Sequence, residues 1–224
     1  MKRSIVLILA SALLLPWIPL AAGEPAEGEE GNYVVIGGWH TENYGSPEQV
    51  EEYEPDGWGP DLRLLTAHDS EDASFMLKAR ILDGSTQNVD LDLDAARMMQ
   101  AHVSFFKINH NLTHDPMTNL DAVAAPKTVR ATDLDPWGHY SIRYSRTDSD
   151  LVLRHPSLPG LSLELNYGEQ HREGMRQSMT MGHCVSCHVV SQPRKVNERT
   201  SDLGASLRYA FSEGAVDVSY SHRN

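Results

Sequence analysis

The chain has few cysteines, few aromatic residues and a single long hydrophobic run. Two of its 224 residues are cysteine and 7% are aromatic, although 40% are hydrophobic. A chain of this length can bury the core of one ordinary domain. It contains no Gly-x-Ser-x-Gly string, no phosphate-binding loop and no zincin motif. Hydrolytic and nucleotide chemistry therefore have no recognisable site.

Positive charge is also scarce. Lys and Arg number 19 against 31 Asp and Glu, which gives a formal net charge of -12. No basic stripe is present that could neutralise the phosphates of a nucleic acid, so we expect no nucleic-acid partner.

The long hydrophobic run lies at the N-terminus. Two basic residues precede an apolar stretch over 5–20, and small residues follow it. This order predicts a secretory signal peptide over residues 1–23. An N-terminal membrane anchor is the alternative, but Pro16 and Pro19 interrupt a run that is already short for a spanning helix. No later stretch has the length of a transmembrane helix, so a mature chain that enters a membrane would do so with strands.

Hydrophobic and polar residues alternate in many later segments, and no segment has a convincing helical period. "NVDLDLDA" places Val89, Leu91 and Leu93 on one face and three aspartates on the other, and "LSLELNY" repeats the pattern. "LGASLRYAF" and "AVDVSYSH" form a similar pair around a three-residue spacer. We predict an all-β fold of antiparallel strands and hairpins, either a β-barrel or part of one.

The strands of the C-terminal pair are about nine residues long, which is the length that a tilted strand needs to cross a bilayer. Their polar face carries small and charged groups that suit a watery barrel interior. A soluble sandwich with one solvated face has the same alternation. The pattern alone leaves both architectures open.

Both cysteines lie in "MGHCVSCHVV", residues 181–190. Cys184 and Cys187 are separated by two residues, and His188 follows directly. Cys-x-x-Cys-His is the signature of c-type haem attachment. The two thiols add to the vinyl groups of one haem, and the histidine becomes the proximal ligand of its iron. The motif predicts one covalent haem c.

Other uses of the two thiols are a disulfide, a redox dithiol and a metal site. A disulfide is the default for a cysteine pair in an exported protein. A thioredoxin-like dithiol should open a helix in a βαβ unit, which the sequence around residue 184 does not resemble. A zinc site needs about four ligands, and no second pair stands at a suitable spacing.

The distal ligand of the iron stays open at this stage. Met179 and Met181 fall on one side of an extended segment, and either thioether could bind iron and raise its potential. His183 directly precedes the first thiol, so we expect it on the proximal side. The remaining candidates are Met175, His171, His102 and His110, where a histidine would give a lower potential.

A family resemblance extends these predictions. The stretch "VEEYEPDGWGPDLRLLTAHDSEDASFMLKARILDGSTQNVDLDLDAARMMQAHVSFFKINHNLTHDP" resembles the N-terminal strands of the outer-membrane β-barrels of porin-cytochrome conduits, the MtrB/PioB type. An "EY" before a loop, a "Q-x-x-D-L-D-L" strand and a strand ending near "HNLTHD" are similar in order and spacing. The resemblance spans roughly residues 31–220.

In that family the barrel spans the outer membrane and surrounds a multihaem cytochrome, and it is an insulating sleeve rather than an enzyme. The resemblance implies extracellular electron transfer, an outer-membrane location with a periplasmic haem segment, and a multihaem c-type cytochrome or other periplasmic redox protein as partner. This chain departs from the family in being several times shorter and in carrying its own haem motif. A truncated chain is one interpretation.

The predicted organisation has five parts. They are a signal peptide (1–23), an acidic linker (24–32), an antiparallel strand region (33–167), a c-type haem-binding loop inserted between strands (168–200) and a C-terminal hairpin (201–224). Two alternatives to the conduit are a soluble periplasmic β-rich monohaem cytochrome, acting as carrier or oxidoreductase subunit, and a haem-based gas or redox sensor. In the conduit, electrons pass through the haem and no bond of a substrate is made or broken.

Overall fold

The structure is a computed structural model that describes residues 32–42, 57–82, 84–96, 98–118, 123–124, 127–128, 130–181 and 188–224. These residues form strands, turns and irregular segments and contain no helix. No helix in this part of the chain could span a membrane. The predicted signal peptide lies outside the described residues, as does all but the end of the acidic linker.

The described residues contain twelve strands. Their bounds are β1 Tyr33–Thr41, β2 Gly57–Asp69, β3 Ala73–Leu82, β4 Thr86–Ala95, β5 Met99–Leu112, β6 Val123–Ala124, β7 Lys127–Thr128, β8 Arg130–Asp133, β9 Tyr140–His155, β10 Leu158–Met181, β11 His188–Phe211 and β12 Gly214–Arg223. The predicted all-β, antiparallel fold class is confirmed.

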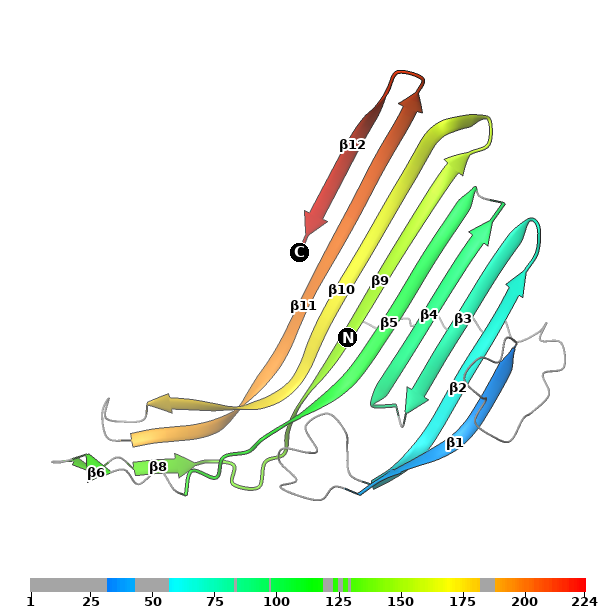
Figure 1. Cartoon of the computed structure of the whole chain (residues 1–224). Helices are drawn as coiled ribbons and strands as arrows, with labels where there is room; N and C mark the ends of the chain where they lie inside the picture. The colour runs from blue at the N-terminus through cyan, green and yellow to red at the C-terminus, as the bar shows by residue number, and fades with distance from the viewer. Residues whose placement is uncertain are drawn as a thin grey trace, which may run out of the picture.

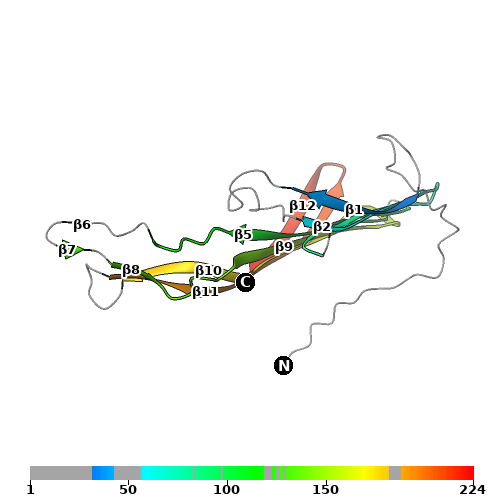
Figure 2. The same ribbon diagram turned by 90° about the horizontal axis from the view of Figure 1, so that it is seen from below.

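Ten of these strands form one sheet. Nine follow the order β1-β2-β3-β4-β5-β9-β10-β11-β12, each antiparallel to the next, and β8 lies parallel to β11. Figure 1 shows the strands side by side, with β10 and β11 bending away beside β8. The turned view in Figure 2 shows how thin the sheet is. The sheet is not closed into a barrel, since β1 and β12 are its edges.

The two faces of the sheet differ in chemistry. Residues paired across a ladder share a face, so Leu77, Leu91 and Val103 lie in one row across three strands. We call this side the apolar face. It contains alternate residues of Phe75–Ile81 in β3, Val89–Leu93 in β4, Ala101–Phe105 in β5, Leu161–Tyr167 in β10 and Leu203–Phe211 in β11. The opposite side, rich in Asp, Arg, Ser and Asn, is the polar face.

The apolar face is exposed over much of its area. Tyr209 is 47% exposed and its cross-strand neighbour Val216 is 56% exposed. Monomeric soluble proteins rarely expose a contiguous apolar area of this kind. Four hydrophobic residues among the described ones are buried. They lie toward the end of the sheet at which β9 and β11 begin, and they are Met117, Tyr140, Ile142 and Val196.

The C-terminal hairpin has the predicted faces. Leu207 pairs with Val218, and Phe211 pairs with Gly214. Its turn is Ser212 and Glu213, one residue shorter than the predicted spacer, because Gly214 already belongs to the ladder.

The haem-binding segment differs from the prediction. Residues 168–181 and 188–200 are strand rather than loop, and pairing between β10 and β11 continues from Gly168–Asp202 to Met181–Val189. The prediction followed apolar alternation, which ends at Tyr167. Main-chain hydrogen bonds hold a ladder whether or not its side chains are apolar, so the strands continue into polar sequence.

Candidate functional site

The haem motif lies at the end of the longest hairpin of the sheet. β10 and β11 each have 24 residues and pair in constant register as far as Met181 and Val189. Cys184 and Cys187 fall between these ends, outside the described residues, and His188 is the first residue of β11. The two thiols and the imidazole keep the order that haem c attachment requires.

A third strand supports the beginning of β11. Residues 130–133 of β8 run parallel to residues 188–191, with Arg130 opposite His188 and Asp133 opposite Ser191. The main-chain N–H of Leu134 also donates to the carbonyl of Ser191 over 3.0 Å. His188 is half-buried beside this strand.

A buried polar cluster lies three residues behind His188. The Nε2 atom of Gln177 donates to the hydroxyl of Ser191 over 2.7 Å and to the carbonyl of Asp115 over 2.6 Å. The main-chain N–H of Asp115 donates back to Oε1 of Gln177 over 2.9 Å. Ser191 is fully buried. One glutamine thus connects β10, β11 and the segment that follows β5.

A histidine–carboxylate pair lies beside this cluster. Nε2 of His114 and Oδ2 of Asp133 are 2.6 Å apart, and their side chains are 17% and 3% exposed. The His114 ring meets Tyr140 edge-on, with centroids 5.1 Å apart. Burial alone would raise the pKa of Asp133, but hydrogen bonds from the N–H of Asp135, from His114 and from Ser191 lower it. Burial, together with the nearby carboxylates, raises the pKa of Tyr140. The pair holds β8 in its place next to β11.

The two predicted distal ligands lie on the opposite side of the hairpin from His188. Met181 pairs with Val189, and Met179 pairs with Ser191, so both methionines share the face of these partners. His188 precedes Val189 in the strand and points to the other face. If a haem packed on the His188 face, Met179 and Met181 would lie on the other side of the hairpin from it. Both methionines are exposed, Met179 by 51% and Met181 by 66%.

The other predicted distal candidates are far from the motif along the strands. Nε2 of His171 donates a hydrogen bond to Oδ1 of Asn197 over 3.1 Å, and His171 is ten residues from Met181, about 33 Å along the strand. His110 lies in the row of Ile142 and Gly174, about 23 Å from the same end. Met175 lies closer, at about 20 Å. His102 lies further away still, in the row of Asp150 and Asn166, and His183 is outside the described residues.

His114 was not among the sequence candidates. The fold brings it to β8, the strand next to His188, through a partner 19 residues away in the chain. The only sequence signal is a His-Asp pair directly after a predicted strand, and that signal does not identify Asp133.

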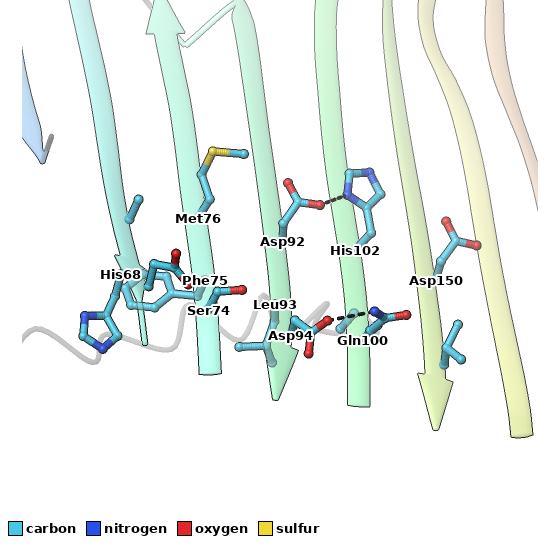
Figure 3. Close-up of a pocket in the computed structure, with 14 residues that line it drawn as sticks. His68, Ser74, Phe75, Met76, Asp92, Leu93, Asp94, Gln100, His102 and Asp150 are labelled. Carbon is cyan, nitrogen blue, oxygen red and sulfur yellow. Dashed lines mark hydrogen bonds and ion pairs between the residues drawn. The ribbon is translucent and has the colours of Figure 1, made fainter. Parts of the chain in front are cut away.

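The polar face carries a second set of hydrogen-bonded side chains. Nδ1 of His102 lies 2.7 Å from Oδ1 of Asp92, and Gln100 donates to Asp94 over 2.7 Å (Figure 3). They border an open hollow of about 430 Å³. The described residues contain no group of three or more His, Cys, Asp and Glu side chains placed to hold a metal ion. This surface is a solvated face with ion pairs such as His102–Asp92.

Comparison with known proteins gave no match to a family model, to a curated protein or to a solved structure. The functional argument therefore depends on the motif and on the geometry. The donor set of two thiols and one imidazole fits haem c, and the exposed Thr180, which shares the face of His188, leaves space on that face of the hairpin end.

Proposed function

We propose that the protein is an electron-transfer component with one covalent haem c, and that its sheet is the outer-membrane barrel part of a porin-cytochrome conduit. One observation carries the proposal: a Cys-x-x-Cys-His motif stands at the end of a sheet that has one apolar face and one charged face. No bond of a substrate changes in this function, so the protein is not an enzyme.

The apolar face approaches the height of a lipid-facing band. Leu161–Tyr167 extends about 20 Å and Leu203–Phe211 about 26 Å along their strands, which at a barrel tilt of about 40° corresponds to a height of about 15–20 Å. Transmembrane barrels carry an outward apolar band about 25 Å tall, with aromatic girdles at both edges. Aromatic residues of the apolar face lie toward both of its ends. Phe75, Tyr209 and Phe211 lie at one end and Trp58, Phe105 and Tyr167 at the other, while Tyr220 of the same face lies between them.

The polar face has the chemistry of a water-filled interior. Ion pairs cross it, including Arg146–Asp148 at 2.6 Å and Arg223–Asp202 at 2.5 Å. Strands that alternate apolar and polar residues, with the apolar side outward, are the signature of transmembrane barrels.

The open edges fit part of a barrel. The nine strands of the main path alternate in direction, so β1 and β12 run the same way. Antiparallel closure therefore requires an odd number of further strands between these edges.

The chain's own residues would hold the haem rather than react. Cys184 and Cys187 would attach it and His188 would ligate the iron. The Gln177–Ser191 hydrogen bond would keep the adjacent ends of β10 and β11 rigid. The bound haem would supply a one-electron couple. A single haem cannot bridge a hydrocarbon core of about 30 Å, so a multihaem c-type cytochrome is the partner that completes the route.

Covalent attachment is tested on a denaturing gel stained for haem peroxidase activity. The wild-type protein and the variants Cys184→Ser and Ser186→Ala are each coexpressed with a c-type haem maturation system and compared on the same gel. We expect haem staining in the wild type and in Ser186→Ala, whose change spares both thiols, and none in Cys184→Ser. An unstained wild-type band would refute the cytochrome function.

Fractionation separates this proposal from the soluble periplasmic cytochrome. A barrel component stays with outer membranes after a wash in concentrated salt, because lipid contact with its apolar face is not electrostatic. Release of all haem-stained protein into the soluble fraction would favour the soluble carrier.

A further inference from the structure

The two ends of the sheet have connections of different lengths. At one end, the short-turn end, four connections have two or three residues each: 70–72, 96–98, 156–157 and 212–213. At the other end, the motif end, three connections are longer, 42–56, 113–139 and 182–187, and only 83–85 is short. In outer-membrane barrels the short turns are periplasmic and the longer loops are extracellular.

The strands extend past the apolar band only at the motif end. In β10 the band ends at Tyr167, and the strand continues to Met181, about 46 Å further. At the short-turn end β10 begins at Leu158, only three residues before Leu161. The haem hairpin therefore projects well beyond any membrane that covers the band.

Positive charge on the apolar face is confined to the same end. In the nine strands of the main path, the described Lys and Arg residues that share this face are Lys107, Arg143, Lys195 and Arg199. All four lie past the band on the side of the motif, the furthest being Lys195, which pairs with Met175 about 26 Å beyond Tyr167. Glu169 and Glu173 lie on the same face there, Glu169 ion-paired with Arg199 at 2.6 Å and Glu173 opposite Arg143, so the four cations leave an excess of two positive charges. Lys107 follows Phe105 by two residues and stands at the edge of the band. The described turns of the short-turn end instead carry Glu71, Asp72 and Glu213.

This distribution of basic side chains fits the outer leaflet of an outer membrane better than the inner leaflet. The outer leaflet consists of lipopolysaccharide, whose lipid anchor and inner sugars carry phosphates. A basic side chain at the edge of a hydrophobic band, such as Lys107, is attracted to such anionic groups, and the attraction decreases with distance from the surface. Connection length, strand overhang and charge are independent features, and all three give the same orientation.

We propose that the motif end faces the cell exterior, so that the projecting haem hairpin is the surface at which electrons pass to or from a redox partner outside the cell. The inference rests on the proposed membrane function. It reverses the periplasmic placement of the haem segment that the sequence alone led us to expect.

The hairpin also indicates the charge of that partner. Arg176 stands directly opposite Arg194 on the polar face, and both side chains are exposed. Like charges opposite one another destabilise a ladder unless an anionic group approaches them. A cytochrome surface rich in carboxylates fits this patch, although the chain as a whole is acidic.

The orientation is tested by labelling intact cells with a membrane-impermeant maleimide. Thr118→Cys places a thiol at the motif end and Ser212→Cys places one in a short turn, and both positions are exposed. The native cysteines are blocked as thioethers in the haem-loaded protein, which haem staining verifies in each sample. We expect Thr118→Cys to be labelled on intact cells and Ser212→Cys only after the outer membrane is permeabilised.

The opposite pattern, with only Ser212→Cys labelled on intact cells, would overturn the orientation and leave the membrane function standing. Labelling of both thiols on intact cells would also overturn it, because neither end would then be shielded. If salt washing removes the protein from the membrane, the proposed function itself fails, and the two failures are therefore distinguishable.

Discussion

Gln177 donates a hydrogen bond over 2.7 Å to the hydroxyl of Ser191, and this hydroxyl is fully buried. The contact joins the two strands that carry the haem motif, three residues behind His188. Because the same glutamine also exchanges two hydrogen bonds with the backbone of Asp115, it connects the hairpin to the segment after β5. The position of the motif thus depends in part on a few buried polar contacts.

Replacing Gln177 with alanine should destabilise the end of the β10–β11 hairpin that carries the motif. The change removes three hydrogen bonds and leaves the buried Ser191 hydroxyl without this donor, which costs about 1–3 kcal/mol. The thermal midpoint of the detergent-solubilised protein should fall. Gln192→Ala is the matched control, because Gln192 is exposed on β11, and it should shift stability by less than about 0.5 kcal/mol. Equal effects of both changes would contradict the role of the cluster.

The His114–Asp133 pair should make stability depend on acid pH. The pKa of Asp133 in the folded protein lies below its ordinary value of 3.8. The stabilisation of the fold by ionised Asp133 is therefore complete above that value. It is lost as the pH falls through the lower pKa that Asp133 has in the folded protein. Thermal midpoints measured at decreasing pH should fall more steeply for the wild type than for Asp133→Asn. The same slope in both proteins would mean that the pair does not contribute.

Met179 and Met181 should not ligate the haem that His188 holds. Both lie on the opposite face of the hairpin, so the double variant Met179→Ala/Met181→Ala should keep the visible absorption spectrum of the wild type in both oxidation states. His188→Ala, by contrast, should change the spectrum of any haem that is still attached. Loss of a methionine-ligation band in the double variant would contradict the register argument.

A charged substitution on the apolar face should reduce assembly in the membrane, and one on the polar face should not. Leu163 and Glu164 are neighbours in β10 and point to opposite sides of the sheet. Leu163→Arg should cost about 2–4 kcal/mol in a membrane and reduce assembly, which the amount of protein in salt-washed outer membranes measures. Glu164→Arg should assemble normally. If both variants assemble equally well, the apolar face does not contact lipid.

The fold class could be predicted from the sequence because each strand has its own alternation of hydrophobic and polar residues. Val89, Leu91 and Leu93 define a face without reference to any other strand. The extension of β10 beyond Tyr167 could not be predicted, because its polar residues have no apolar period and its pairing with β11 is a matter of backbone register.

The surroundings of the motif were hidden for a related reason. Asp133 and His114 are 19 residues apart, and Gln177 and Asp115 are 62 residues apart, so neither contact has a local signal. The Cys-x-x-Cys-His string can be read from the sequence because its three side chains are adjacent in the chain, and its use for haem stays a prediction. The proposed orientation of the sheet depends on strand lengths and registers, which the sequence alone does not give.

The most direct test of the central claim is the intact mass of the mature protein purified from salt-washed outer membranes. We predict the mass of the polypeptide plus one haem, and the mass of the polypeptide alone for the variant in which Cys184 and Cys187 are both serine. A wild-type mass equal to the polypeptide less two hydrogens would mean that the thiols form a disulfide, and it would contradict the assignment of electron transfer to this protein.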